Sequence, residues 1–154
     1  MNKIVLNKKD ILEFQQNRNP YLFVDAATEI IPGVSAKGYR IFNEDEWFFK
    51  VHWEKDPNVP GMLQIESLVQ MSSLSIVTLP KMKNKILYLT SATNLKFSKK
   101  ILPNKTLIME TYVKSFKRGV ANFEGHGYVD NDLACQGKFT LILPDLIKSY
   151  SLKK

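Results

Sequence analysis

The chain has 154 residues and a mass of 17.7 kDa, a size that fits one domain with a continuous apolar core. An apolar share of 44% and a charged share of 24% exclude disordered and fibrous proteins. The most apolar stretch, residues 62–79, contains Glu66, so it predicts a buried helix and no membrane span. Residues 1–10 lack the apolar run of a signal peptide, and Cys135 is a single cysteine, so we expect a cytoplasmic protein.

The charge balance, 22 basic against 15 acidic residues, gives a net charge of +7 and is typical of a protein that meets an acidic partner. We do not expect that partner to be nucleic acid, because only Arg18, Arg40 and Arg118 carry the planar guanidinium that reads bases. The lysines are scattered along the chain, so the simpler interpretation is that they form a generally solvated surface and no binding site.

The first part of the chain predicts a short helix and a hairpin. The helix has Asp10 as its predicted N-cap and Glu13 three residues later, as in a capping box. Two runs rich in aromatic and aliphatic residues, 21–31 and 34–42, flank a Pro-Gly pair and predict a hairpin. Residues 47–51, Trp-Phe-Phe-Lys-Val, predict a buried extended segment.

The rest of the chain predicts one long helix followed by strands. Residues 61–79 are apolar around the whole helical circumference, which is typical of a helix enclosed on most sides, and Pro60 and Pro80 bracket it. The apolar period then changes to two, which predicts three or four long antiparallel strands. One central helix and about six strands predict a single α+β domain, with a core at about 11–143 and a polar, partly unstructured tail at 145–154.

Two titratable residues stand out as candidates for chemistry. Glu66 lies inside the most apolar helix, where a carboxylate must be paired, held neutral or placed at a cleft; an exposed helix edge is the alternative. Gln70 lies four residues later on the same face and is placed to hydrogen-bond it. His52 precedes Glu66 by 14 residues, across a loop that contains two prolines; a packed, structural histidine is the alternative.

Three segments resemble the FabZ-type β-hydroxyacyl-acyl carrier protein dehydratases. Residues 49–70, FKVHWEKDPNVPGMLQIESLVQ, are similar to the family signature F-x-G-H-F-P-x-x-P-x-M-P-G-V-L-x-I-E-A-x-x-Q. Residues 17–25 are similar to H-R-x-P-F-L-L-V-D, and residues 94–103 to A-x-F-x-x-P-V-x-P. The likeness spans roughly residues 11–143. Val51, Trp53 and Glu54 stand where the signature has Gly, Phe and Pro, and their bulk beside His52 bears on the width of the acyl tunnel.

The resemblance implies a hotdog fold, in which a curved antiparallel sheet wraps a long central helix. It implies a homodimer, or a trimer of dimers, in which His52 of one protomer faces Glu66 of the other. His52 would remove the proton α to a thioester carbonyl and Glu66 would assist departure of the β-hydroxyl, which gives a trans-2-enoyl thioester and water. The implied partner is acyl carrier protein with its acyl-phosphopantetheine, in fatty acid, specialised lipid or polyene synthesis, and no metal or organic cofactor is expected.

General chemistry agrees with those roles. Histidine is the side chain with an ordinary pKa near neutrality, as the base requires, and burial in an apolar helix raises the pKa of a carboxyl so that it stays protonated. Gly61 and Met62 open the helix after Pro60, so their backbone N–H groups are candidates for binding the thioester carbonyl, and Gly61 permits close approach.

Further candidates surround this pair. We expect an acyl tunnel, lined by Trp53, Leu63, Leu68 and Phe97. A lysine-rich rim is the predicted contact for the acidic carrier protein, formed by Lys96, Lys99 and Lys100. Cys135 and His126 are interpreted as structural. A hotdog thioesterase and a catalytically silent acyl-binding subunit remain the alternative functions.

Overall fold

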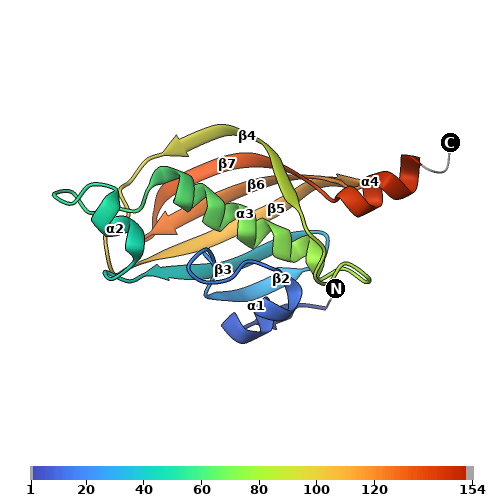
Figure 1. The fold of residues 1–154 in the computed structure, drawn as a ribbon, viewed down its shortest axis with the longest axis horizontal. Coiled ribbons are helices and arrows are strands. Elements are labelled where there is room, and N and C mark those ends of the chain that lie inside the picture. Colours follow the sequence, from blue (N-terminus) through green and yellow to red (C-terminus); the bar gives the residue numbers. More distant parts are fainter. Residues whose placement is uncertain (1, 152–154) are drawn as a thin grey trace.

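The computed structural model describes residues 2–151, which form one antiparallel sheet and four helices (Figure 1). The order along the chain is β1 (Ile4–Leu6), α1 (Lys8–Phe14), β2 (Ala26–Ile31), β3 (Ser35–Phe42), α2 (Trp47–Val51), α3 (Gly61–Val77), β4 (Tyr88–Phe97), β5 (Lys105–Lys117), β6 (Val120–Val129), β7 (Asp132–Ile142) and α4 (Pro144–Ser151). The seven strands lie in the order β1-β2-β3-β5-β6-β7-β4. The α+β prediction is therefore confirmed, and β4 is one edge of the sheet.

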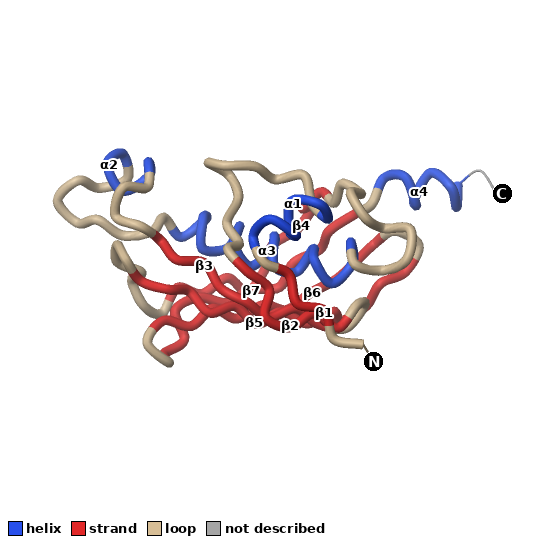
Figure 2. The backbone as a smooth tube through the Cα atoms, turned by 90° about the horizontal axis from the view of Figure 1, so that it is seen from below, coloured by secondary structure: helices blue, strands red, loops and turns tan. Residues whose placement is uncertain are grey.

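Helix α3 lies along the inner face of the curved sheet (Figures 1 and 2). It begins at Gly61, directly after Pro60, and Val77 is its last residue, so the predicted helix is confirmed and ends slightly early. From Gln64 to Val77 every residue is buried except Glu66. The serines within it satisfy their hydroxyls locally, as when Ser67 Oγ donates to Leu63 O at 2.8 Å. A carboxylate at position 66 is therefore unusual, because the helix around it is almost entirely buried.

The predicted hairpin is strands β2 and β3, which turn at Gly33 with a positive φ of 75°. Gly38 of β3 lies directly beneath the central helix: a Cβ there would come within 2.6 Å of Met71 Cε and 2.0 Å of Ala26 O. The absence of a side chain at Gly38 therefore allows α3 and β2 to approach β3 closely. After β4, strands β5, β6 and β7 pair in sequence, as the period-two pattern predicts.

One predicted element boundary and one predicted element type are wrong. Asn7, not Asp10, is the N-cap of α1, and Asp10 is the third helical residue, whose side chain accepts from Asn7 N. Residues 47–51 form helix α2, not an extended segment. Their aromatic content favours a strand, but Phe48 and Phe49 are both buried, and adjacent residues share one face of a helix more readily than one face of a strand.

The tail is also more ordered than predicted. Residues 144–151 form helix α4, which projects from one end of the sheet, while residues 152–154 of the predicted unstructured tail lie outside the described part (Figure 1). Leu146 packs against the core, and Leu143 N donates to Gly119 O at 2.8 Å. The β5–β6 turn thus supplies contacts that the local sequence does not reveal. No helix within residues 2–151 has the length and apolarity needed to cross a membrane.

Candidate active site

His52 is placed at the end of helix α2, where it is the C-cap. Its Nδ1 lies 3.2 Å from the backbone carbonyl oxygen of Asn58. Because a carbonyl oxygen only accepts, this contact requires Nδ1 to carry the hydrogen, which leaves the lone pair on Nε2. The indole of Trp53 stacks on the imidazole at a centroid distance of 4.1 Å and an interplanar angle of 19°. The contact at Nδ1 and the stacked indole therefore fix the orientation of the imidazole ring.

An open groove of about 410 Å³, here called the His52 groove, lies beside this imidazole. It joins the loop after α2, the first turn of α3 and the end of β4. A backbone hydrogen bond from Val59 N to Ile101 O, 2.8 Å long, holds the two loop segments together. The lining residues are His52, Trp53, Asn58, Val59, Gly61, Gln64, Phe97, Ser98, Lys99 and Lys100.

The start of α3 faces this groove through Gly61. A Cβ on Gly61 would meet the Phe97 ring at 3.0 to 3.3 Å, so glycine lets the ring lie against the first helical turn. The N-cap, Pro60, makes no side-chain hydrogen bond to the helix. The first N–H groups of a helix have no partner within it, so those of Gly61 and Met62 are donors at the positive end of the α3 dipole.

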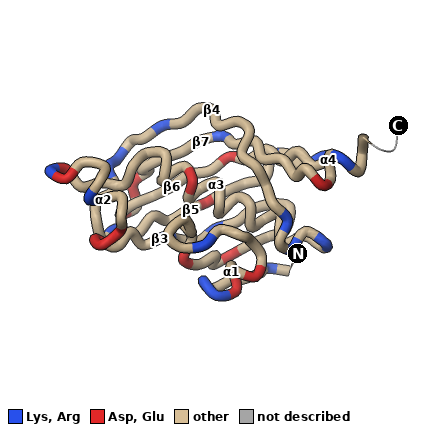
Figure 3. Tube along the Cα trace, viewed as in Figure 1, with Lys and Arg blue, Asp and Glu red and all other residues tan. Residues whose placement is uncertain are grey.

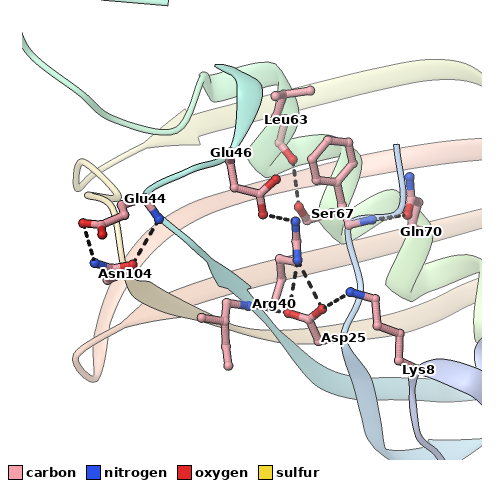
Figure 4. Close-up of polar contacts among 11 residues, drawn as sticks. Lys8, Asp25, Arg40, Glu44, Glu46, Leu63, Ser67, Gln70 and Asn104 are labelled. Atoms are coloured by element: carbon pink, nitrogen blue, oxygen red, sulfur yellow. Dashed lines mark hydrogen bonds and ion pairs between the residues drawn. The ribbon is translucent and has the colours of Figure 1, made fainter. Parts of the chain in front are cut away.

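Glu66 is held elsewhere on α3, beside the segment before β2. Gln70 Nε2 donates to Glu66 Oε1 and to Tyr21 O, both at 2.9 Å, while Gln70 Oε1 accepts from Phe23 N at 2.8 Å. Figure 4 shows Gln70 in this position on α3. Burial raises the pKa of the Glu66 carboxyl, and the hydrogen bond from Gln70 opposes this in part. The predicted Glu66–Gln70 contact is thus confirmed, and the Gln70 amide that binds the carboxyl through Nε2 is itself held by backbone hydrogen bonds at both of its ends.

The structure therefore brings some of the predicted residues together and separates others. Those that share the His52 groove are His52, Trp53, Gly61, Phe97, Lys99 and Lys100. Those that do not line it are Pro60, Met62, Leu63, Glu66, Leu68, Gln70 and Lys96. Leu68 is fully buried in the core, and Met62 is 61% exposed. Within one chain, the two candidate catalytic residues thus belong to different surroundings.

The predicted lysine rim is divided in the same way. Lys99 and Lys100 reach the His52 groove but pair with acidic neighbours, Asp132 at 2.7 Å and Asp56 at 2.5 Å. Lys96 lines a separate hollow with His126. Figure 3 shows that basic positions are spread along the β4 edge and around the α2 end of the molecule. The positive charge near the groove is therefore partly compensated within the chain.

A buried charge network next to α2 was missed by the sequence analysis (Figure 4). Arg40 is 4% exposed; its guanidinium binds Glu46 and also Asp25, with Nη1 to Oδ1 at 3.1 Å. Asp25 also accepts from Lys8 Nζ at 2.9 Å and from Ile41 N at 2.7 Å. Glu46 is the N-cap of the helix that carries His52 at its other end. The sequence signal that could have revealed this network is Arg40, a charged residue at a position of the predicted strand 34–42 whose side chain points toward the core.

The remaining candidates, Cys135 and His126, differ in burial. Cys135 is fully buried, and burial raises the pKa of its thiol to about 12, so the prediction of a packed cysteine is confirmed. His126 Nε2 lies 3.6 Å from Glu124 Oε1 on a different strand face from the core. Within residues 2–151, no group of three His, Cys, Asp or Glu side chains is arranged to hold a metal ion.

Comparison with known proteins assigns the chain to a family. The family model described as a FabA-like domain matches residues 16–138. The chain belongs to the FabA-like family. It is 30% identical over 139 residues to the 3-hydroxyacyl-[acyl-carrier-protein] dehydratase FabZ of Roseiflexus castenholzii, covering 90% of this chain and 97% of that protein. The FabZ of Natranaerobius thermophilus is 33% identical over 138 residues, with 88% and 97% covered.

Among solved structures, one subunit of the dehydratase heterocomplex ApeI:P from Xenorhabdus doucetiae superposes with a TM-score of 0.73. The match covers 87% of this chain and 90% of that one at 11% sequence identity. At that identity the likeness shows the fold, and together with the seven-stranded sheet around α3 it confirms the predicted hotdog fold.

Proposed function

We propose that this FabA-like chain is a hydro-lyase that dehydrates 3-hydroxyacyl thioesters carried by acyl carrier protein, in fatty acid or related lipid synthesis. The observation that carries the proposal is Glu66: a carboxyl with a raised pKa, fixed by Gln70, in an otherwise buried stretch of α3. The FabZ names of relatives at about 30% identity over most of the chain agree with it. A cytoplasmic location follows as part of the same proposal.

The proposed reaction uses a base, two N–H donors and an acid. His52 Nε2 takes the proton from the carbon α to the thioester carbonyl, and the N–H groups of Gly61 and Met62 bind the oxygen on which negative charge develops. The carbon–carbon double bond forms as the β-carbon–oxygen bond breaks. Glu66 gives its proton to the departing hydroxyl, which leaves as water. Solvent then carries a proton from His52 to Glu66, which restores both groups.

We propose that the complete site forms between two copies of the chain, each a single hotdog domain. His52 and Glu66 have separate surroundings within one chain, so a second copy is needed to bring a base and an acid together. Strand β4 supports this arrangement: it is a ten-residue edge strand with exposed apolar side chains, among them Tyr88 at 55% and Leu89 at 40%. A long exposed edge is a template for pairing with another strand.

The first test follows turnover of a 3-hydroxyacyl-carrier substrate over several chain lengths. We expect an enoyl absorbance without release of free thiol. Release of thiol would indicate a thioesterase, and an inert wild-type protein would indicate a silent acyl-binding subunit; either result contradicts the proposal.

The second test mixes two inactive variants. His52→Ala and Glu66→Gln should each lack activity, and heterodimers refolded from both should regain one wild-type site per dimer, about half of the activity of the wild-type dimer, because one of the two sites then holds both groups. Light scattering should report a dimer or a trimer of dimers. A monomer, or well-mixed heterodimers without activity, would contradict the shared site.

A further inference from the structure

The hydrogen bond at Nδ1 restrains the His52 ring only weakly. Its Nδ1 lies 3.2 Å from Asn58 O, which is the long end of the range for N–H···O hydrogen bonds. A rotation of the ring moves Nε2, the atom assigned to the α-proton, and about 1 Å of misplacement at a reacting group can cost roughly 100-fold in rate. A second contact, on the face of the imidazole, is therefore needed to set the plane of the ring.

The indole of Trp53 supplies that contact. It stacks on the imidazole with centroids 4.1 Å apart and planes 19° apart. Adjacent side chains diverge in a helix or a strand, so the stacking requires the bend of the chain at His52, where α2 ends. Asp56 N donates to Trp53 O at 3.1 Å, and the Asp56 carboxylate pairs with Lys100 at 2.5 Å. The indole is thus placed by a turn that is tied to the segment after β4.

The two tryptophans of the chain lie at opposite ends of α2 and have different neighbours. Trp47 meets the buried ring of Phe48 edge-on, with centroids 5.5 Å apart. Trp53 is more exposed, at 57% against 46%, and within residues 2–151 its one ring partner is the imidazole of His52. Trp47 therefore extends the aromatic core, whereas Trp53 covers a titratable ring in the His52 groove.

The face of an indole also favours a cation over a neutral ring. His52 becomes an imidazolium when Nε2 takes a proton, and tryptophan is the aromatic side chain that attracts a cation most strongly, within about 6 Å of its centre. The partner of Nδ1, Asn58 O, carries no charge. The charged side chains that line the groove are Lys99 and Lys100, which are cations. Within one chain the indole therefore stabilises the form of His52 that the proton transfer creates, and such an interaction raises kcat.

We propose that Trp53 is a positioning residue for the dehydration: its indole sets the plane of the His52 ring and stabilises the imidazolium that forms when Nε2 takes the α-proton. This inference rests on the proposed dehydratase function and adds a residue to it. It also reassigns Trp53, which the sequence suggested as part of an acyl tunnel. A tunnel residue acts on the binding of the acyl chain, whereas a positioning residue acts through His52 on turnover, whatever the acyl chain.

The kinetic test compares Trp53→Leu and Trp53→Phe with wild type on 3-hydroxybutyryl and 3-hydroxyoctanoyl carrier protein. In Trp53→Leu we expect kcat to fall by about ten-fold on both substrates, with KM within about two-fold, because the lost contact acts on proton transfer. Trp53→Phe keeps an aromatic face and should retain kcat within about three-fold of wild type. Trp47→Leu is the matched control: it removes the other half-exposed indole and should leave kcat within about two-fold of wild type.

A second measurement tests the stacking itself and needs no activity. Protons held over the face of an aromatic ring are shielded in a nuclear magnetic resonance spectrum. The ring-proton resonances of His52 should therefore move downfield in Trp53→Leu and stay in place in Trp47→Leu. His126, the other histidine of the chain, is the internal reference.

Each contrary result overturns the inference. A loss that grows with the acyl chain or appears mainly in KM would assign Trp53 to the acyl tunnel, and an unchanged kcat would show that the stack has no role in turnover. Trp53→Phe as slow as Trp53→Leu, His52 resonances that do not move, or an equal loss in Trp47→Leu would each contradict it as well. If Trp53→Leu does not fold, Trp53→Met gives the aliphatic comparison. Failure of the proposed function is seen separately, as a wild-type protein that dehydrates neither substrate while the His52 resonances still depend on Trp53.

Discussion

Two acidic side chains, Glu46 at the start of α2 and Glu66 within α3, are both partly removed from water, yet their partners differ. At Glu46 the guanidinium of Arg40 binds the carboxylate, and Asp25 completes the network (Figure 4). At Glu66 the partner is the neutral amide of Gln70. Burial raises the pKa of each, but a cation opposes this at Glu46, whereas a single neutral hydrogen bond does so at Glu66.

The difference is that Glu46 is held in an ion pair, whereas Glu66 has none among residues 2–151 and suits the proton transfer proposed for it. A proton on Glu46 would weaken an ion pair that ties α2 to strand β3, so its protonation is coupled to the local fold. A proton on Glu66 costs no ion pair among the described residues, so this carboxyl gains or loses it while Gln70 keeps its orientation. The two positions therefore predict opposite effects of mutation on stability and on turnover.

The largest expected effect is on activity. In the proposed mechanism Glu66→Gln removes the proton that leaves with the hydroxyl, so we expect kcat to fall about 1000-fold, as for loss of a general acid. The melting temperature at neutral pH should stay or rise, because a partly buried charge is removed and Gln70 keeps an acceptor. Enoyl absorbance and thermal melts check this. Glu13→Gln is the control, since Glu13 is exposed and pairs with Lys83; a comparable loss there would contradict the assignment.

Arg40→Met should show the reverse pattern. It leaves Asp25 and Glu46 without their shared cation in buried surroundings, and we expect the free energy of unfolding to fall by about 3 kcal/mol. Urea denaturation measures the loss. The matched surface change, Lys3→Met, breaks the Lys3–Glu29 pair, whose lysine is 65% exposed, and should lower the free energy of unfolding far less. Equal losses in the two variants would refute the contrast between buried and exposed pairs.

The pH dependence of stability should identify Glu66 directly. Its folded-state pKa is raised above the ordinary value of 4.5, so between these two values the folded chain binds more protons than the unfolded chain. The contribution of Glu66 to stability is therefore present at low pH and lost as the pH rises through this window. The unfolding free energy of wild type should fall relative to that of Glu66→Gln from about pH 4.5 upward, and then level off. A difference that is constant with pH would contradict the raised pKa.

The smallest expected effect concerns the start of α3. In Gly61→Ala, the new Cβ lies within about 3.0 Å of the Phe97 ring, so the ring must move. Because Phe97 is half exposed, we expect a stability change below about 1 kcal/mol and a KM increase of about three-fold through a narrowed groove. The double variant Gly61→Ala with Phe97→Leu should recover the wild-type KM. A KM that stays raised in the double variant would assign the effect to the helix backbone.

The sequence alone determined the features that depend on local signals. Pro60 sets the start of α3, the Pro-Gly pair sets the β2–β3 turn, and the change of apolar period sets the later strands. Glu66 was predicted to be unusual because one charged residue interrupts an apolar helix, and Gln70 was found by helical spacing. Each of these signals involves residues close together in the chain, so the sequence alone is enough to predict it.

Only the tertiary structure decided the features that depend on distant contacts. Helix α2 forms where propensity favours a strand because Phe48 and Phe49 are buried together, and α4 forms against the β5–β6 turn. The pairing of Arg40 with both Asp25 and Glu46 and the separation of His52 from Glu66 depend on how neighbouring elements pack against one another. Burial and pairing across such distances are set by the packed chain, since no local pattern specifies which groups will meet.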